Sequence, residues 1–368
     1  MSITKRGAVY RARLRDHDGR EHTRHFSLRR DAEAWEAQMR ADLIRGTFVD
    51  PKREEMTVRG YSEEWLAAQS LKPSTEALYV SHLRNHIIPA LGSKRLMSVT
   101  PTSVRGFVKH LGTKLAPATV STVHGITAML FKSAVADGYL ARTPCVKTAP
   151  KAPRPRRVIP LAPEEIHRLA SAMPERLSAL VYCSAGLGLR QGEVLGLTVA
   201  RVRFLDRRVQ ISEQLQTLPD GRVMLVPPKT PKSDRTVPLP AFVADAVSSH
   251  LSSFPVGPSG LVFTTPKGEP WHRSRFGDVW RAAVERAGLP KGTRLHDLRH
   301  TYVAMLIAAG EHPKVIQDRL GHASITETMD TYGHLFPAAE EGTRDAIDRA
   351  FSGAVADSVR TGAVVNRL

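Results

Sequence analysis

The sequence contains few cysteines and no long apolar run. Its two cysteines, Cys145 and Cys183, exclude a disulfide framework and offer no spacing for a metal site. No apolar stretch reaches the roughly 20 residues that a membrane-spanning helix needs. The first residues, MSITKRGAVYRARLRD, lack the apolar segment of a signal peptide. We therefore expect a soluble, cytoplasmic protein that does not associate with a membrane.

Acidic residues are scarce relative to basic ones. Lys and Arg number 53 against 36 Asp and Glu, which leaves a net charge of +17. The excess is concentrated in residues 56–150, with 11 basic and 4 acidic side chains, and in residues 151–157, where four of the seven residues are basic. A charge of this size indicates a polyanionic partner, most commonly a nucleic acid.

The length of 368 residues predicts two or three domains. The sequence shows no repeats or low-complexity tracts, and its patterns predict a multidomain, mainly α protein with small β-sheets (α+β). The expected parts are a small ββ(β)α domain at 1–50, a linker at 51–57, a helical domain at 58–147, a basic proline-rich linker at 148–160, a mixed α/β domain at 161–352 and a tail at 353–368.

The N-terminal part has the pattern of a small ββα unit. Residues 8–27 alternate as two short strands around a turn at Asp16–Gly19, and residues 28–46 form an amphipathic helix that ends at a glycine. Three arginines share one face of the first strand. That face is either a solvated edge or a ribbon that contacts DNA. The arginines are Arg11, Arg13 and Arg15.

Prolines mark the starts of helices and the linker in the next 100 residues. Helices are expected around 61–68, 74–87, 101–111 and 117–137, with prolines at or beside three of the starts. The following segment, KTAPKAPRPRRVIP, combines four prolines with basic residues, so it is extended and suited to a phosphate backbone. Its candidate DNA-binding residues are Arg154, Arg156 and Arg157.

Two polar positions stand out early in the last domain. In SAGLGLRQGEVLGL, Arg190 opens a helix after a glycine-rich turn, with Glu193 three residues later. The pair is either a surface ion pair or a helix start that holds a phosphate. Around VPPKTPKSDRTVPLP, the strands RVQISEQLQT and RVMLVPPKT are expected to form one hairpin, and RTVPLP to add a third strand. Lys229 and Lys232 then fall at the turn, where they are either solvated or placed to enter a groove.

The segment TRLHDLRHTYVAMLIAAG predicts a helix with His296 and Arg299 on one face. Its core side is expected to include Leu298, Tyr302 and Met305. His296 and His300 have the i, i+4 spacing of a helical zinc pair. The sequence offers neither a third ligand nor the glutamate of that motif, so we reject a metal site.

The segment VIQDRLGHASITETMDTYGHLF predicts a helix, a turn at His322, and a second helix from Ser324. Ser324 and Glu327 have the spacing of a capping box. Ile325, Met329 and Tyr332 recur on one helical face, so periodicity alone makes Tyr332 a core aromatic.

The order and spacing of these residues resemble the tyrosine recombinase (phage integrase) family. The family pattern is an arginine, a hairpin lysine before threonine, H-x-L-R-H, L-G-H, and a tyrosine followed by x-H. The corresponding segments here are GLRQGE, PKTPKSDRTVPL, LHDLRH, RLGHASI and DTYGHL. In layout the similarity covers the whole chain: residues 1–50 resemble the arm-type DNA-binding domain of phage integrases, 58–147 the core-binding domain, and 161–352 the catalytic domain.

The resemblance implies a role for each residue of the pattern. Tyr332 is the nucleophile that forms a 3′-phosphotyrosine, Arg190 and Arg299 bind the phosphate oxygens, and His322 donates a hydrogen bond. Lys229 protonates the leaving 5′ oxygen, with Lys232 as the alternative. His296 either accepts the tyrosine proton or orients the site.

The resemblance also implies partners. We expect a metal- and ATP-independent integrase without cofactors that acts as a homotetramer on double-stranded DNA, at core-type and arm-type attachment sites. It would work at the nucleoid of a bacterial host cell, and a DNA-bending host factor and an excision factor are further partners that the resemblance allows. Two alternatives are another tyrosine recombinase, such as a resolvase or transposon recombinase, and a catalytically silent, sequence-specific DNA-binding protein. The extra N-terminal domain disfavours a two-domain resolvase, and the complete set of polar residues disfavours a silent protein.

Overall fold

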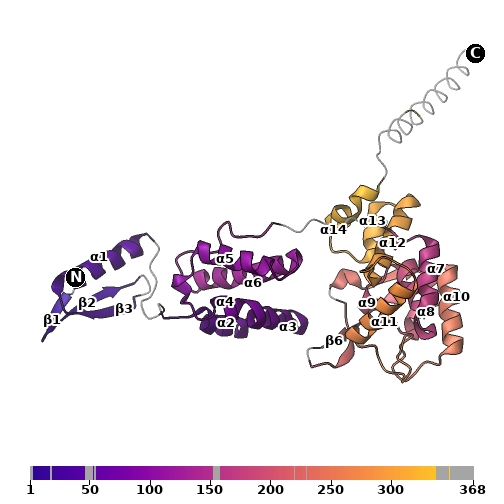
Figure 1. The fold of residues 1–368 in the computed structure, drawn as a ribbon, viewed down its shortest axis with the longest axis horizontal. Coiled ribbons are helices and arrows are strands. Elements are labelled where there is room, and N and C mark those ends of the chain that lie inside the picture. Colours follow the sequence, from indigo (N-terminus) through magenta and orange to yellow (C-terminus); the bar gives the residue numbers. More distant parts are fainter. Residues whose placement is uncertain are drawn as a thin grey trace, which may run out of the picture. The chain divides into compact units, whose positions relative to one another are not determined.

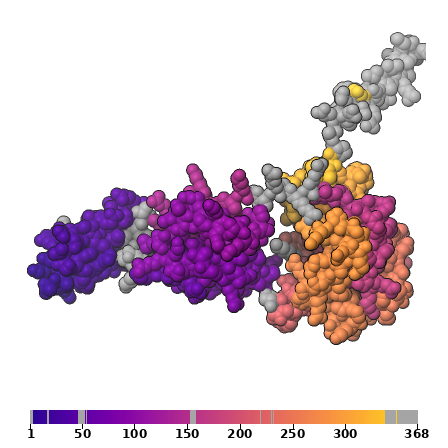
Figure 2. All heavy atoms as spheres, in the orientation of Figure 1, coloured from indigo at the N-terminus to yellow at the C-terminus, as the bar shows by residue number. Residues whose placement is uncertain are grey.

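The computed structural model describes residues 3–16, 19–45, 53, 55–151, 158–218, 220–228, 230–336 and 348. The chain divides into two compact units, residues 1–155 and 156–368, which are described separately below. Figure 1 shows their helices and strands, and Figure 2 shows the described residues of unit 2 as a closely packed body. The finer domain boundaries stay predictions. Within the described ranges, no helix has both the length and the apolar character to cross a membrane.

Unit 1 begins with a three-stranded antiparallel sheet and a helix. The strands β1 (Ile3–Arg6), β2 (Val9–Arg15) and β3 (Glu21–Phe26) pair in sequence order, and α1 (Arg29–Ile44) covers one face. Ala12 and Leu14 of β2 are buried with Ala32 and Trp35 of α1. The two predicted strands are therefore confirmed. The structure has a third strand, β1, which the sequence pattern did not predict because Ile3 is its one inward apolar residue and a single residue shows no alternation.

The rest of unit 1 is helical, as predicted. Its elements are α2 (Val58–Ala67), α3 (Pro73–His82), a π-helical turn η2 (Leu83–Ile87), α4 (Ile88–Leu91), a 3₁₀ turn η3 (Leu96–Ser98), α5 (Pro101–Gly112) and α6 (Pro117–Ala136). Pro73, Pro101 and Pro117 occupy first helical positions, where their missing N–H costs no hydrogen bond. A separate core, which includes Tyr61, Trp65 and Phe131, holds these helices together.

Unit 2 is a mixed α/β body around a large apolar core. Its helices are α7 (Pro163–Ala172), α8 (Glu175–Leu187), α9 (Gln191–Leu195), α10 (Ala241–Ser253), α11 (Arg273–Arg286), α12 (Leu295–Ala308), α13 (Pro313–Leu320) and α14 (Ile325–Tyr332), with 3₁₀ turns η4 (Val199–Arg201), η5 (Pro231–Ser233) and η6 (Gly333–Leu335). Helix α8 contributes the largest number of fully buried residues, because it packs against α7, α10 and α12. The core therefore fixes the C-terminal end of α8 and the start of α12, where polar residues gather.

The strands of unit 2 form two small sheets. Strands β4 (Val202–Arg203), β5 (Arg208–Ile211) and β8 (Arg235–Pro238) make one antiparallel sheet, and β6 (Gln214–Thr217) and β7 (Val223–Val226) make a hairpin. The prediction of one continuous strand over β5 and β6 is wrong. Strand β6 turns away to lie against α9, where the backbone of Leu215 comes so close to Gly192 and Gly196 that a Cβ there would lie 2.6–3.0 Å from it.

Two details of the C-terminal helices also differ from expectation. The stripe on α14 is buried only at Tyr332, because Ile325 and Met329 are 41% and 40% exposed, and Met305 of α12 is exposed as well. Ser324 caps α14 as predicted, through a bond from the Thr326 N–H, but the expected capping box is absent. The Glu327 carboxylate, which would complete the box, lies instead with Oε1 at 3.7 Å from Nε2 of His322. The sequence also predicts an amphipathic helix after Phe336, with Ala346, Ile347, Ala350 and Phe351 on one face, and these four residues lie outside the described residues.

Candidate active site

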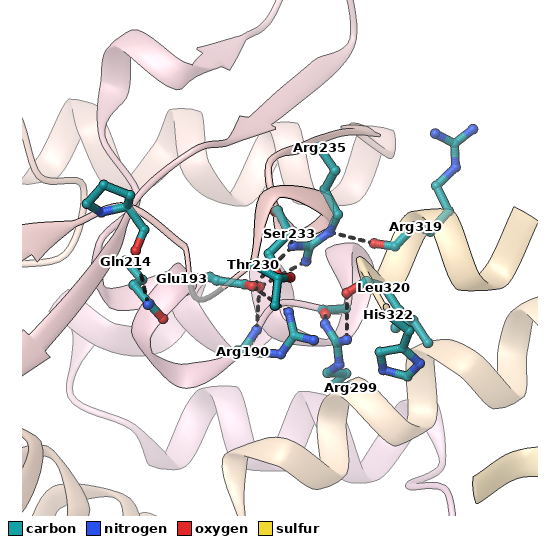
Figure 3. Close-up of polar contacts among 12 residues, drawn as sticks. Arg190, Glu193, Gln214, Thr230, Ser233, Arg235, Arg299, Arg319, Leu320 and His322 are labelled. Carbon is teal, nitrogen blue, oxygen red and sulfur yellow. Dashed lines mark hydrogen bonds and ion pairs between the residues drawn. The ribbon is translucent and has the colours of Figure 1, made fainter. Parts of the chain in front are cut away.

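Helices α9 and α12, strand β8 and the turn after α13 bring polar side chains of unit 2 to one place. Figure 3 shows Arg190 at the start of α9, Arg299 on α12 and His322 after α13 lying around a common position, with Glu193 between Arg190 and Arg235. Their proximity also affects their pKa values: besides desolvation, the charges of Arg299 and Arg190 lower the pKa of His322, and the charge of Arg190 lowers the pKa of Arg299. Three of the residues predicted from the sequence are therefore neighbours in space.

Arg190 is fixed by the carboxylate of Glu193. Its backbone N–H donates to Glu193 Oε2 at 2.9 Å, and its Nη1 donates to Oε1 at 2.9 Å. The same carboxylate accepts two bonds from the buried Arg235 guanidinium, at 3.1 and 2.9 Å. Burial alone would raise the pKa of Glu193, but the bonds and charges of Arg235 and Arg190 outweigh it and lower the pKa to about 2. Glu193 is therefore an anion that orients two cations.

Arg299 is held by backbone carbonyls and is 1% exposed. Its Nη1 donates to the carbonyl of Gly188 at 2.5 Å, and its Nη2 donates to that of Leu320 at 2.7 Å. Gly188 is the left-handed C-cap of α8, with φ of 63°, and a Cβ there would meet the Tyr302 ring at 2.4 Å. Desolvation and the charge of Arg190 lower the pKa of Arg299 to about 9. It remains a cation at neutral pH.

His322 occupies the turn between α13 and α14 and is 7% exposed. Its Nδ1 lies 2.9 Å from Thr328 Oγ1, and its backbone carbonyl accepts a bond from Gln317 Nε2 at 3.1 Å. Desolvation, followed by the charges of the neighbouring arginines, lowers the pKa of His322 to about 3. In the tautomer whose Nδ1 accepts from the Thr328 hydroxyl, the neutral ring carries its proton on Nε2, and that nitrogen is then a hydrogen-bond donor.

Tyr332, at the end of α14, is 1% exposed and belongs to a small apolar cluster with Val303, Ile316 and Leu320. Its hydroxyl lies 2.7 Å from Nδ1 of His300, and the two rings meet edge to face at 5.5 Å. Burial raises the pKa of Tyr332 to about 12, against the lowering effect of Arg299. The phenol is thus stored in the core and hydrogen-bonded to a histidine of α12.

His296 lies one turn before His300, on the exposed side of α12. The two rings meet edge to face at 4.7 Å. Partial desolvation and the nearby cationic groups, His300 first, lower the pKa of His296 to about 4. A neutral His296 is therefore expected across the physiological pH range.

The lysine and the proposed DNA-binding arginines are described only in part. Lys229 lies outside the described residues, whereas Lys232 donates from Nζ to the carbonyl of Ala323 at 2.9 Å. Arg154, Arg156 and Arg157 also lie outside the described residues. The three arginines of β2 do share the face opposite Ala12 and Leu14, as the alternation predicted. These three are Arg11, Arg13 and Arg15.

Sequence reasoning missed Arg235 and the contact of His300 with Tyr332. Arg235 has a signal in hindsight: in the strand RTVP it shares the inward positions with Val237, and a buried arginine requires a partner. It also donates from Nε to the carbonyl of Arg319 at 2.7 Å, which ties Glu193 to the end of α13. His300 has the i, i+4 spacing from His296 that we weighed only for a metal. The partner that matters, Tyr332, is 32 residues away along the chain, and periodicity does not report such contacts.

Comparison with known proteins identifies related sequences for both units. The family model described as "Phage integrase family" matches residues 160–338, and "Phage integrase, N-terminal SAM-like domain" matches residues 57–112. The integrase of Mycobacterium phage D29 is 28% identical over 321 residues, covering 82% of this chain and 83% of the phage protein. A "Tyrosine recombinase XerC-like" protein of Caldanaerobacter subterraneus is 26% identical over 92% of this chain and 94% of its own.

Solved structures with a similar fold include two integrases bound to DNA. The Tn1549 transposon integrase in complex with a circular intermediate DNA superposes with a TM-score of 0.71 and 21% identity, over 80% of this chain and 99% of that one. A lambda integrase dimer bound to a core site has a TM-score of 0.61 and 18% identity, over 92% of this chain and 97% of that one. At these identities the similarity concerns the fold.

Proposed function

Because the chain belongs to the phage integrase family of tyrosine recombinases, we propose that it is a site-specific DNA recombinase that integrates the DNA of a phage or another mobile element. The observation that carries the proposal is the meeting of Arg190, Arg299 and His322 around one position, with the buried Tyr332 beside the same helix α12.

The proposed reaction exchanges one phosphodiester for another. The Tyr332 hydroxyl attacks the scissile phosphate, so that a bond forms between its oxygen and phosphorus while the bond from phosphorus to the 5′ oxygen breaks. The product is a 3′-phosphotyrosine and a free 5′ hydroxyl, and the reverse attack by another 5′ hydroxyl rejoins the strand. The energy of the broken bond stays in the covalent intermediate, so rejoining needs no ATP.

Charge stabilisation is assigned to the two arginines and to His322. Attack places additional negative charge on the non-bridging oxygens, which guanidinium groups bind through short, charge-assisted hydrogen bonds. Two carbonyls hold Arg299 in place, and Glu193 holds Arg190. Both cations are thus positioned before the substrate arrives, which avoids reorganisation during the reaction. His322 Nε2 is proposed to donate a third hydrogen bond.

Lys229 is proposed as the general acid for the leaving 5′ oxygen, because an ammonium group on a flexible chain suits proton delivery. The described contact of Lys232 with Ala323 supports this choice over Lys232, since that ammonium already holds the His322 turn. A substrate with sulfur at the 5′ bridging position tests the assignment, because a thiolate leaves without a proton. We expect this substrate to restore cleavage by Lys229→Ala but not by Lys232→Ala. If this substrate restored cleavage only in Lys232→Ala, the general acid would be Lys232 instead.

His296 is proposed to orient the phosphate, since a ring with a pKa of about 4 is a weak base at neutral pH. Its position on the exposed side of α12, three residues from Arg299, supports this role.

Residues 58–147 and 161–352 are proposed to bind the core-type site, and residues 1–50 the arm-type site through Arg11, Arg13 and Arg15. The basic segment 148–160 links the first two and raises the effective concentration of the second contact once the first has formed. Exchange between two duplexes cuts four strands, so we propose a homotetramer on DNA in the cytoplasm of a bacterial host. Lambda integrase has been solved as a dimer and as a tetramer on DNA. A bending factor and an excision factor remain proposed partners.

A covalent trapping experiment tests the function. The protein is incubated with a nicked DNA carrying the attachment site from the sequence flanking its gene, and denaturing gels report any protein–DNA adduct. We expect an adduct from the native protein and none from Tyr332→Phe. The matched control is Tyr182→Phe, which removes another phenol of unit 2, bonded to His167 at 3.0 Å. Absence of an adduct on a site that the native protein demonstrably binds would contradict the proposal, and an adduct from Tyr332→Phe would place the nucleophile elsewhere.

A further inference from the structure

One histidine in contact with the proposed nucleophile has no role in the mechanism above. His300 Nδ1 lies 2.7 Å from the Tyr332 hydroxyl oxygen, a normal length for a strong hydrogen bond. The rings meet edge to face, with centroids 5.5 Å apart. Because the neighbouring residue on α12 is Arg299, one helical turn carries both a phosphate-binding cation and a partner for the phenol.

We propose that His300 is a further catalytic residue, which accepts the phenolic proton of Tyr332 during attack on DNA. The proposal rests on the proposed function of Tyr332 as nucleophile. As the bond from the Tyr332 oxygen to phosphorus forms, its O–H bond breaks and the proton moves to Nδ1 of His300. The bond from phosphorus to the 5′ oxygen breaks, and that oxygen takes a proton from the general acid, Lys229. In the rejoining step the proton on His300 returns to the Tyr332 oxygen.

The phenol needs such a partner. Burial raises the pKa of Tyr332 to about 12, so the hydroxyl carries its proton at neutral pH. An acceptor within hydrogen-bond reach of the proton is the first geometric requirement for general base catalysis, and His300 meets it. His296 contacts the His300 ring, with 4.7 Å between the ring centroids, and its own side chain is exposed.

Charged groups of both signs lie around His300. His300 lines a cavity of about 160 Å³ in unit 2, together with the carboxylates Glu165 and Asp297 and the guanidinium of Arg294. Arg294 Nη2 lies 3.2 Å from Asp297 Oδ1. Negative charge near an imidazole stabilises its protonated form. The opposing groups are His296, at 4.7 Å between ring centroids, Arg299 on the same helix and Arg294 in the cavity lining. His300 therefore lies between the phenol and a cavity lined by charges of both signs.

The attack also requires that the phenol be uncovered, because Tyr332 is 1% exposed. Val158, Leu306, Leu335 and Phe336 pack against its cluster. The proposal requires that the phenol become accessible while α12 and α14 keep the bond between His300 and Tyr332.

The test combines a histidine variant with a more acidic phenol. His300→Gln keeps an amide oxygen that accepts a hydrogen bond but cannot take up a proton. We expect it to bind the attachment site as the native protein does and to form the adduct roughly 10²–10⁴-fold more slowly. A fluorinated tyrosine at position 332 has a more acidic phenol and depends less on a base. In the His300→Gln protein, this substitution should raise the rate of adduct formation at least tenfold. A purely structural role of His300 would not produce this increase.

The controls separate the two proposals. His167→Gln alters a second His–Tyr pair of unit 2, with 3.0 Å between ring nitrogen and hydroxyl and 5.5 Å between ring centroids, and should cleave at the native rate. Two results would overturn the role of His300 alone, provided that the native protein forms the adduct. One is that His300→Gln forms the adduct as fast as the native protein, and the other is that the fluorinated tyrosine restores none of the lost rate. No adduct from the native protein would instead overturn the proposed function. If His300→Gln does not fold, His300→Asn is measured in the same way, with the same outcomes deciding.

Discussion

The guanidinium of Arg235 donates Nη1 and Nη2 to the two carboxylate oxygens of Glu193, at 3.1 and 2.9 Å, and both side chains are almost fully buried. Because Glu193 also holds Arg190, and Arg235 also holds the Arg319 carbonyl, this one pair connects α9, β8 and the end of α13. The proposed phosphate site is thus supported by an ion pair that need not touch DNA.

Replacement of Glu193 by Gln should destabilise unit 2 and misplace Arg190. It leaves the buried Arg235 without a counter-charge, and removal of one partner of a buried ion pair costs about 3–5 kcal/mol. Urea unfolding at neutral pH measures the loss. The matched control is Glu213→Gln, at a partly exposed pair with Arg201 at 3.8 Å, which should cost less than about 1 kcal/mol. Similar costs for the two variants would contradict the role of the Glu193 pair.

Replacement of Gly321 by Ala should disturb the His322 turn. Gly321 has a φ of 64°, and a Cβ there would lie 3.0 Å from the Lys232 carbonyl oxygen and 3.1 Å from Ser233 Cα, both backbone atoms. We expect a loss of about 1–3 kcal/mol in unfolding free energy, together with slower adduct formation. Gly310→Ala is the control, since Gly310 also has a positive φ, of 78°, but has open space around it. If Gly310→Ala were as damaging to cleavage, the close packing at Gly321 would not be the cause.

Replacement of Arg190 by Ala should separate DNA binding from cleavage. Arg190 is proposed to act on charge that develops in the transition state, so its loss should slow adduct formation by about 10²-fold or more. The change removes one cation among 53 basic residues, so affinity for the attachment site should fall little. Filter binding and adduct kinetics on the same DNA give the two numbers. Arg201→Ala removes a partly exposed arginine of unit 2 and serves as control. An equal loss of binding and cleavage in Arg190→Ala would argue against a catalytic role.

Local patterns predicted the elements of this fold well where one segment carries the signal. Pro73, Pro101 and Pro117 marked helix starts because proline costs nothing there, and the alternation in β2 placed its arginines on one face. Patterns failed where a distant segment decides the packing. Strand β6 leaves the line of β5 to meet the glycines of α9. Ile325 and Met329 look like core residues only when α14 is considered alone.

The same limit applies to the site. The sequence predicted the pair of Arg190 and Glu193, because the two residues are three positions apart at one helix start. It did not predict Arg235, the second partner of Glu193, which is 42 residues away along the chain. His300 was visible beside His296, but its bond to Tyr332 joins α12 to α14. The assignment of Tyr332, Arg190, Lys229, His296, Arg299 and His322 to catalysis came from the resemblance to a family and stays a prediction, because spacing alone supports both packing and chemistry for each of them.

Stability should fall on mild acidification because of His322, whose pKa is lowered to about 3 from an ordinary value of 6.5. As the pH falls below about 6.5 the unfolded chain takes up a proton on this ring while the folded protein does not, so folding is progressively disfavoured down to about pH 3. Glu193 has a pKa of about 2 against an ordinary value of 4.5, so its contribution is lost only at lower pH. Other histidines act in the same direction between pH 7 and 5.5, because burial lowers the pKa of His296 to about 4 and also lowers the pKa values of His82, His124 and His250. The difference between the native protein and His322→Gln therefore isolates His322. Urea unfolding across this range should show a smaller loss of stability in His322→Gln than in the native protein. An equal loss in both proteins would mean that His322 is not the buried neutral ring that the structure describes.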